Sequence, residues 1–357
     1  MSVRTALSLG AALAGLVIAG AANARELKQV GTIAVPGTPL DNFDISFVDQ
    51  RTNRLYFADR SNASVDIFDV KSGKLLARIP GFTGAQKSNA DSGPDGVLVA
   101  GGNAWAGDGN STAKVIDLKT NKIVATVSTG GKKRVDEMAY DPKDDIVIVA
   151  NNADEPPFAT LISNKPGYKV LAKIPLPDAS DGIEQPVYYP PNGMFYMSVP
   201  ELKGQKGKGG VAVIDPRKGR LVKMLPVDGC IPAGLARGPG ANLVIGCNAG
   251  GEDGLPSVIV VINANTGAVV KSIPGIGAAD MVAYNPKAGQ YYTASRAMKG
   301  GPVLGVIDAK SNTLVQSIKL GGGNPHSVAV SQAGNRVLVP MGTSKGGCGC
   351  IAVFAPQ

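Results

Sequence analysis

Six ionisable residues recur along this chain of 357 residues, each shortly before or at the start of a short apolar stretch. They are Asp44, Asp95, Asp136, Glu184, Asp280 and His326, and Pro232 stands at a seventh equivalent position. Carboxylates that lie close together must take up protons, pair with cationic side chains or bind a metal ion. Oxygen ligands favour a hard cation such as Ca²⁺ or Mg²⁺, and His326 would also admit Mn²⁺ or Zn²⁺. The pattern predicts a charged site if the fold brings these residues together.

The spacing of the seven positions indicates how they would be brought together. The intervals run from 41 to 51 residues, and each unit holds short runs of alternating β-branched residues, such as 146–150 and 258–262, without a helical period. A repeat of about 40 to 50 residues with four short strands is typical of a β-propeller. The sequence therefore predicts an all-β, seven-bladed β-propeller with four-stranded antiparallel blades.

The two ends of the chain predict how the ring closes. The seventh unit stops at Gln357, where the turn before its fourth strand would begin, and residues 29–33 resemble the fourth strand at 314–318. We expect the N-terminal strand to complete the last blade, which removes an exposed sheet edge. Residues 25–357 would then form a single propeller domain.

The first 24 residues resemble an export signal, with a short positive start, an apolar run and Ala22-Asn23-Ala24 as a cleavage site. The run is too short for a membrane span of roughly 20 residues, so we expect a periplasmic or secreted protein. The formal net charge of +8 is accompanied by no nucleic-acid-binding motif. We therefore expect a monomer without a nucleic-acid partner, whose partner is a small molecule or another exported protein.

Export permits disulfide bonds, and the chain has four cysteines. Cys230 and Cys247 flank a predicted hairpin, and symmetric antiparallel pairing would place them opposite each other. We expect them to form a disulfide rather than remain two buried thiols. Cys348 and Cys350 are alternate residues of a strand, for which a local disulfide is favoured over a soft-metal site.

Several phrases carry a family resemblance. They are Leu55-Tyr56-Phe57-Ala58-Asp59, Val147-Ile148-Val149-Ala150-Asn151, Asn324-Pro325-His326-Ser327-Val328-Ala329-Val330 and the Val-Ile-Asp entries to the turns. Together they resemble the bacterial YVTN-type β-propeller repeat family over nearly all of the chain after the signal. The resemblance implies an exported propeller and assigns no activity.

In a propeller the first strand of each blade runs along the central channel, so its first residue lies near the channel mouth. The six ionisable residues are thus expected to converge there. Basic residues of the loops on the same face could fold inward and pair with them, in particular Arg60, Arg134 and Arg296. All nine residues are candidate ligand-binding residues. We expect an exported, non-catalytic propeller that binds a small ligand or a partner protein at this mouth.

A second resemblance gives the alternative function. Leu55-Tyr56-Phe57-Ala58-Asp59 and Pro94-Asp95-Gly96-Val97 are similar to phrases of the gluconolactonase and senescence-marker propellers, whose carboxylate and amide ligands hold a divalent metal. The resemblance implies a metal such as Ca²⁺ and a hydrolase that opens esters or lactones, with Asp44, Asp136, Glu184 and Asp280 as candidate ligands. The early Glu-Gly-Pro phrase of that family is replaced by Asn42-Phe43-Asp44. The sequence leaves open whether the protein is an enzyme.

Overall fold

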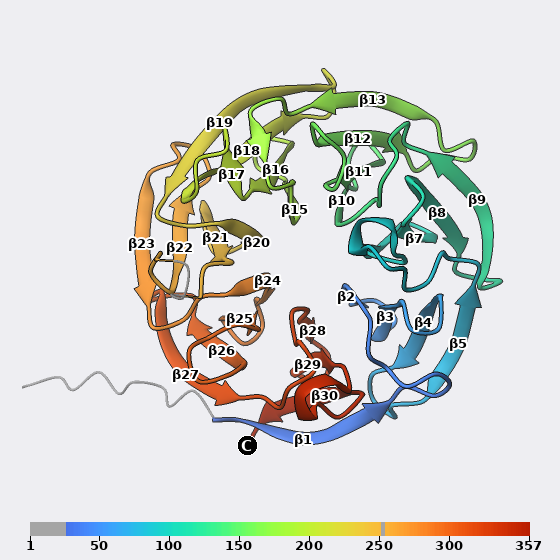
Figure 1. The fold of residues 1–357 in the computed structure, drawn as a ribbon, viewed down its shortest axis with the longest axis vertical. Helices are drawn as coiled ribbons and strands as arrows, with labels where there is room; N and C mark the ends of the chain where they lie inside the picture. The colour runs from blue at the N-terminus through green and yellow to red at the C-terminus, as the bar shows by residue number, and fades with distance from the viewer. Residues whose placement is uncertain (1–25, 251–253) are drawn as a thin grey trace, which may run out of the picture.

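The computed structural model describes residues 26–250 and 254–357, and they form seven four-stranded antiparallel sheets around a central axis (Figure 1). This confirms the seven-bladed β-propeller. The predicted export signal at residues 1–24 lies outside the described residues. From the axis outward, the blades are β2 (Ser46–Asp49), β3 (Arg54–Asp59), β4 (Ser64–Asp69), β5 (Leu75–Pro80); β6 (Val97–Ala100), β7 (Asn103–Asp108), β8 (Thr112–Asp117), β9 (Lys122–Ser128); β10 (Met138–Asp141), β11 (Ile146–Asn151), β12 (Phe158–Ser163), β13 (Val170–Pro175); β15 (Pro186–Tyr189), β16 (Met194–Val199), β18 (Lys208–Asp215), β19 (Arg220–Asp228); β20 (Pro232–Arg237), β21 (Asn242–Cys247), β22 (Val258–Asn263), β23 (Val269–Pro274); β24 (Ala279–Asn285), β25 (Gln290–Ser295), β26 (Val303–Asp308), β27 (Thr313–Lys319); and β28 (Ala329–Ser331), β29 (Arg336–Met341), β30 (Cys350–Pro356), β1 (Leu27–Ala34).

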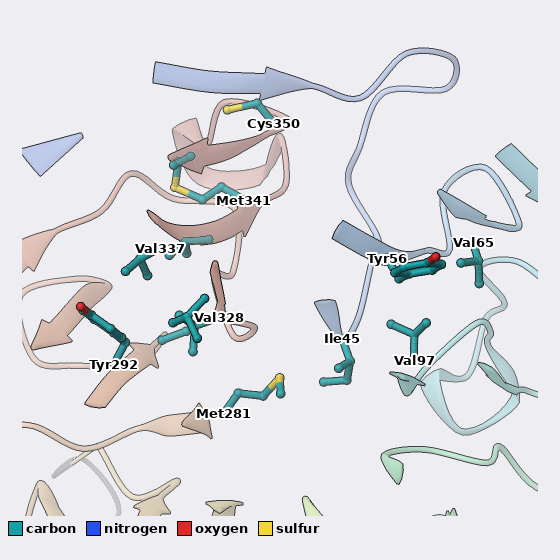
Figure 2. Packing of buried hydrophobic residues seen from close by; sticks show 14 of the residues in the cluster. Ile45, Tyr56, Val65, Val97, Met281, Tyr292, Val328, Val337, Met341 and Cys350 are labelled. Atoms are coloured by element: carbon teal, nitrogen blue, oxygen red, sulfur yellow. The ribbon is translucent and has the colours of Figure 1, made fainter. Parts of the chain in front are cut away.

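The burial of each strand follows its place in the blade. The second strand is sandwiched between neighbouring blades, and all six residues of β11 are buried. The outermost strand has one face in solvent, so exposed and half-buried residues alternate along β9. Apolar side chains fill the space between blades. Figure 2 shows part of one such cluster, in which Tyr56 and Val65 of the first blade face Val97 of the second.

The turns after the third strands are built as their residue types predict. In the first blade, the Asp69 carboxylate accepts a hydrogen bond from the Ser72 backbone N–H at 2.7 Å, and Gly73 has a φ of 71°. In the second, Asp117 accepts from the Thr120 N–H at 2.8 Å, and Asn121 has a φ of 55°. These aspartates stabilise their own turns and lie away from the axis.

The N-terminal strand closes the ring as predicted. β1 pairs antiparallel with β30, from Leu27 opposite Pro356 to Ala34 opposite Cys350. Its two inward residues, Leu27 and Ile33, are buried. In Figure 1, β1 lies as the outer strand beside β30 at the two ends of the chain. The last blade is therefore made from both ends of the sequence.

The fourth blade departs from the expected pattern. Its third strand, β18, is longer than those of the other blades, because it begins at Lys208 within the basic, glycine-rich stretch 203–210. Its extension is paired, because β19 continues to Asp228 and places that residue opposite Lys208. A further short pair, β14 (Ala179–Ser180) with β17 (Glu201–Leu202), has no sequence signal of its own.

Both cysteine pairs are joined. Cys230 and Cys247 form a disulfide with their Cα atoms 5.1 Å apart, and Cys348 and Cys350 form the other with 5.2 Å between Cα atoms. The symmetric hairpin pairing that we predicted for Cys230 and Cys247 is wrong by two residues, because Pro232 rather than Cys230 lies opposite Cys247. The register also shifts between Pro232 and Leu235. The irregularity leaves Cys230 within bonding distance although it precedes β20.

No helix among the described residues has the length and apolar character needed to cross a membrane. The two helical segments in this part of the chain are single 3-10 turns, η1 (Asn89–Asp91) and η2 (Ser344–Gly346). Of these, η1 lies next to the site described below.

Gln185 ties three blades together inside the channel. Its Oε1 accepts hydrogen bonds from the backbone N–H of Leu235 at 2.7 Å and of Val282 at 3.3 Å, in the fifth and sixth blades. Gln185→Leu would leave a buried N–H without an acceptor, so we expect a loss of about 1–3 kcal/mol in the free energy of unfolding by urea. Gln86→Leu is the matched control, because Gln86 is exposed and its side chain donates to the nearby Thr83 carbonyl within the same loop. Equal stability of the two variants would contradict the role of Gln185.

Candidate functional site

A polar cavity of about 290 Å³ lies on the axis, where the inner strands begin. Of the six predicted ionisable residues, five line it: Asp44, Asp136, Glu184, Asp280 and His326. The blade architecture places them at equivalent positions. The backbone N–H groups of Asp44, Asp136 and Glu184 donate to the carbonyls of Ala58, Ala150 and Ser198, which continues each inner hairpin by one step. We call this space the mouth cavity.

Asp95 differs from the other five. It is fully buried and does not line the mouth cavity. Its carboxylate contacts Nη2 of Arg60, and the same nitrogen contacts Asp44. Asp95 is thus separated from the cavity by Arg60, and its predicted role as a ligand-binding residue has no direct geometric support.

Arg60 is held rigidly among these carboxylates. Its Nη1 donates to Oδ1 of Asn89 in η1 at 2.8 Å, and its Nε donates to the Pro94 carbonyl at 3.3 Å. Burial works against the charge of Arg60, but Asp44 and Asp95 outweigh it and raise its pKa. The guanidinium is a permanent cation built into the wall of the cavity.

Arg134 and Asp136 form a second paired group in the third blade. Arg134 Nη2 lies 2.8 Å from Asp136 Oδ2, and Arg134 Nε donates to Asn152 Oδ1 at 3.1 Å. Asn152 in turn donates to Asp136 Oδ2 at 2.6 Å. The three side chains therefore close a small hydrogen-bonded triangle.

The sixth blade contains a similar arginine–aspartate pair, but its arginine follows the second strand, whereas Arg134 precedes the first strand of its blade. Arg296 Nη1 lies 2.9 Å from Asp280 Oδ2, and its Nη2 reaches Asn248 Oδ1 at 3.5 Å. The expectation that Arg60, Arg134 and Arg296 fold inward is thus fulfilled for all three. Other basic loop residues stay outside the cavity lining, among them Lys133, which pairs with Asp91 at 2.8 Å.

His326 completes the wall on the side of the first blade. Its Nε2 lies 3.2 Å from Asp44 Oδ1, its Nδ1 lies 2.8 Å from the Asn324 carbonyl, and its ring stacks on Phe43 with centroids 4.7 Å apart. Burial opposes the charge on Asp44, but Arg60 and the hydrogen bond from His326 outweigh it and hold the pKa of Asp44 below its usual value. Asp44 is therefore ionised, and its carboxylate is already paired with Arg60 and hydrogen-bonded to His326.

Apart from the exposed Asp41, two carboxyl groups of the mouth cavity have no cationic partner in the described part of the chain. Glu137 is 5% exposed, and its Oε2 has no hydrogen-bond partner in the described part of the chain. Glu184 forms no ion pair with a described residue, and the positive charges of Arg134 and Arg296 only partly oppose the rise in its pKa. Burial raises the pKa of both residues well above the usual value, and neighbouring carboxylates raise it further, Glu184 and Asp136 for Glu137 and Asp136 and Asp280 for Glu184. These two groups are the part of the wall that is open to a ligand.

Burial also raises the pKa of two other acidic residues of this region, Asp136 and Asp95. Burial raises the pKa of Asp136 to about 6, although Arg134 opposes the shift. Burial also raises the pKa of Asp95 well above its usual value, although Arg60 and Arg134 oppose the shift. Altogether six carboxyl groups line the mouth cavity against three guanidinium groups, counting Asp41 at its rim. The site has an excess of acid.

The metal hypothesis gains no support from this arrangement. Among residues 26–250 and 254–357, no group of three or more His, Cys, Asp or Glu side chains is arranged to hold a metal ion. Of the four candidate ligands, Asp44, Asp136 and Asp280 each engage an arginine instead. A divalent metal at this position stays a prediction.

Sequence reasoning missed Glu137, Asn152 and Asn248. The two asparagines could have been found from the repeat. A polar residue stands 16 residues after four of the seven anchor positions, at the end of the second strand of a blade, and these residues are Arg60, Asn152, Asn248 and Arg296. Glu137 directly follows Asp136, so alternation along a strand predicts that it points away from its neighbour. Only the structure shows that Glu137 lies next to the axis.

No family model matches this chain, and no curated protein matches its sequence. Among solved structures, a chain described as Kuenenia stuttgartiensis Hydrazine Synthase is similar, with a TM-score of 0.73 and 15% sequence identity over 89% of this chain and 96% of that chain. At that identity the similarity concerns the fold. The YVTN-type resemblance stays a prediction, and the findings together describe a β-propeller scaffold with a polar cavity at its axis.

Proposed function

We propose that this protein binds a small organic cation, an ammonium compound, in the mouth cavity. The observation that carries the proposal is the state of Glu137 and Glu184, which line the cavity without a cationic partner while every arginine of the wall is already paired. A buried carboxylate without a counter-charge is unfavourable, and a bound cation would remove that cost. The three arginines are best understood as structural, because each is paired with a carboxylate of its own blade.

The polar wall suits an ammonium group for a second reason. The side chains of Asn42 and Asn324 also line the cavity, and their amide oxygens are neutral hydrogen-bond acceptors. An ammonium group donates up to three hydrogen bonds and accepts none, so acceptors are the groups it needs. A cavity of about 290 Å³ also lies at the lower end of the volumes that small-molecule sites occupy.

We also propose that the protein works outside the cytoplasm, in the periplasm or after secretion. Two disulfides and the absence of a free cysteine among the described residues support this, because disulfides persist in oxidising compartments. The predicted signal at residues 1–24 points the same way.

Calorimetric titration with methylammonium tests the binding proposal. We expect saturable binding that Glu184→Gln weakens at least tenfold, because the variant keeps the shape of the side chain and removes its charge. The affinity should rise with pH through the raised pKa of Glu137 and Glu184, since only the ionised carboxyl groups attract the cation. Asp228→Asn is the matched control, as Asp228 is exposed and pairs with Lys208 on the rim of the fourth blade.

A Ca²⁺ titration of chelator-treated protein distinguishes the alternative. We expect no saturable binding of Ca²⁺ that depends on Glu184. Stoichiometric Ca²⁺ binding that Glu184→Gln abolishes, together with no response to methylammonium, would contradict the ammonium proposal and favour the metal-dependent hydrolase.

A further inference from the structure

The channel below the mouth cavity is hollow and apolar. Two adjoining cavities of about 500 and 410 Å³ run along the inner strands, and six residues line both, the apolar Phe47, Val187 and Met281 and the polar Ser46, Gln185 and Arg237. Most other lining side chains are those of valine, leucine, alanine and proline. In Figure 2, Ile45 and Met281 point toward one another from opposite sides of this space. Apolar walls of this kind favour an aliphatic ligand over ordered water.

The mouth cavity and the larger of these cavities meet at Glu137. Both Glu137 and Ile45 line the two spaces, so they stand at the boundary between the polar and the apolar part of the axis. Glu137 is buried there with an unpartnered Oε2. An acid at the edge of an apolar cavity needs a ligand whose positive charge adjoins an apolar portion.

The other charged residue in the walls of the two lower cavities is Arg237. It is exposed and stands at the end of β20, the end of the inner strand away from the mouth. An acidic residue, Glu137, therefore lies at one end of the apolar channel, and a basic residue, Arg237, lies at the other. A second positive charge on the ligand would be placed in the apolar channel or near Arg237, and both positions are unfavourable.

From this arrangement we infer that the ligand is an amphipathic ammonium, whose cationic head lies in the mouth cavity and whose aliphatic chain extends into the apolar channel. The inference rests on the proposed function and narrows it to one class of ligand. The distance from Glu137 to Tyr140 along the inner strand of the third blade is roughly 10 Å, three residues of about 3.3 Å each. An octyl chain fits that length.

A homologous series of n-alkylammonium ions, from methyl to octyl, tests the inference by calorimetry on the unaltered protein. We expect the affinity to rise roughly fourfold for each CH₂ that enters the channel, with an increasingly negative heat-capacity change. 1,8-Diaminooctane should bind at least tenfold more weakly than octylammonium. An affinity that stays flat from ethyl to octyl, or a diamine that binds as well as the monoamine, would overturn the inference.

A substitution in the channel wall tests whether the aliphatic chain of the ligand lies in the channel. Val187 is half-buried and lines both lower cavities, and Val187→Asn puts a polar group of similar size into the wall. Octylammonium should lose at least tenfold in affinity, and methylammonium should be unaffected. Val124→Asn, on the outer face of β9, is the matched control and should change neither. If Val187→Asn does not fold, Val99→Asn, which lines only the larger lower cavity, replaces it.

The outcomes separate the two proposals. Methylammonium binding without any gain from a longer chain leaves the proposed function standing and contradicts the inference alone. Octylammonium binding that is the same in Glu184→Gln as in the unaltered protein would mean that the head lies outside the mouth cavity, which contradicts both.

Discussion

Removal of residues 26–35 is expected to lower the melting temperature of the propeller by on the order of 10 °C or more, or to prevent folding altogether. The deletion takes away β1, so β30 becomes an unpaired edge and Leu27 and Ile33 no longer cover the last blade. Burial of two such side chains contributes about 3–6 kcal/mol, a large part of a typical folding free energy of about 5–15 kcal/mol. Thermal unfolding followed by circular dichroism measures the effect.

A circular permutant supplies the control for this deletion. The backbone N–H of Gln357 donates to the Glu26 carbonyl at 3.1 Å, so a short glycine-rich turn can join these two residues directly. A chain that begins at Gly37 and ends with β30, the turn and β1 keeps every strand pair. It should melt close to the natural protein. If the simple deletion melts at the natural temperature, β1 does not hold the ring together.

Arg60→Met is expected to cost about 3–5 kcal/mol of unfolding free energy, because it leaves the buried carboxyl groups of Asp44 and Asp95 without their cation. The methionine side chain keeps the apolar stem and removes the charge. Urea unfolding at pH 7 gives the measurement. Arg51→Met is the matched control, since Arg51 is mostly exposed and its pair with Asp49 should contribute less than about 1 kcal/mol.

A compensated variant distinguishes charge from packing. Asp95→Asn added to Arg60→Met replaces one of the two buried carboxyl groups that contact Arg60 by a neutral amide, and Asp44 keeps its hydrogen bond with His326. We expect the double variant to recover at least half of the lost stability. No recovery would show that the packing of Arg60 around η1, rather than its charge, stabilises this part of the wall.

The fold could be predicted from the sequence because it is periodic. Each blade repeats the same order of apolar strands and Asp-bearing turns, and alternation along a strand is a local property that residues 146–150 or 258–262 show by themselves. Closure by β1 was also predictable, since residues 29–33 match a fourth strand and the seventh unit lacks one. The pair β14 and β17 was not, because two residues carry no periodic signal.

The site was only partly predictable, for a physical reason. The anchor residues share one position in the repeat, so their convergence follows from symmetry. Whether an anchor faces the cavity depends on its neighbours in space, and Arg60 covers Asp95 because η1 holds it across the interface between two blades. The open carboxyl of Glu137 and the hollow channel depend on the sizes of side chains from several blades at once, which no single repeat reveals.

The shared last blade has a consequence for the order of synthesis. A ribosome makes β1 before the other described strands and its partner β30 after them, so β1 cannot pair until all seven blades have been synthesised. A stop codon that removed only β30 would eliminate one strand and with it two strand interfaces, β29 with β30 and β30 with β1. Loss of β30 should therefore be as harmful as loss of a whole internal hairpin.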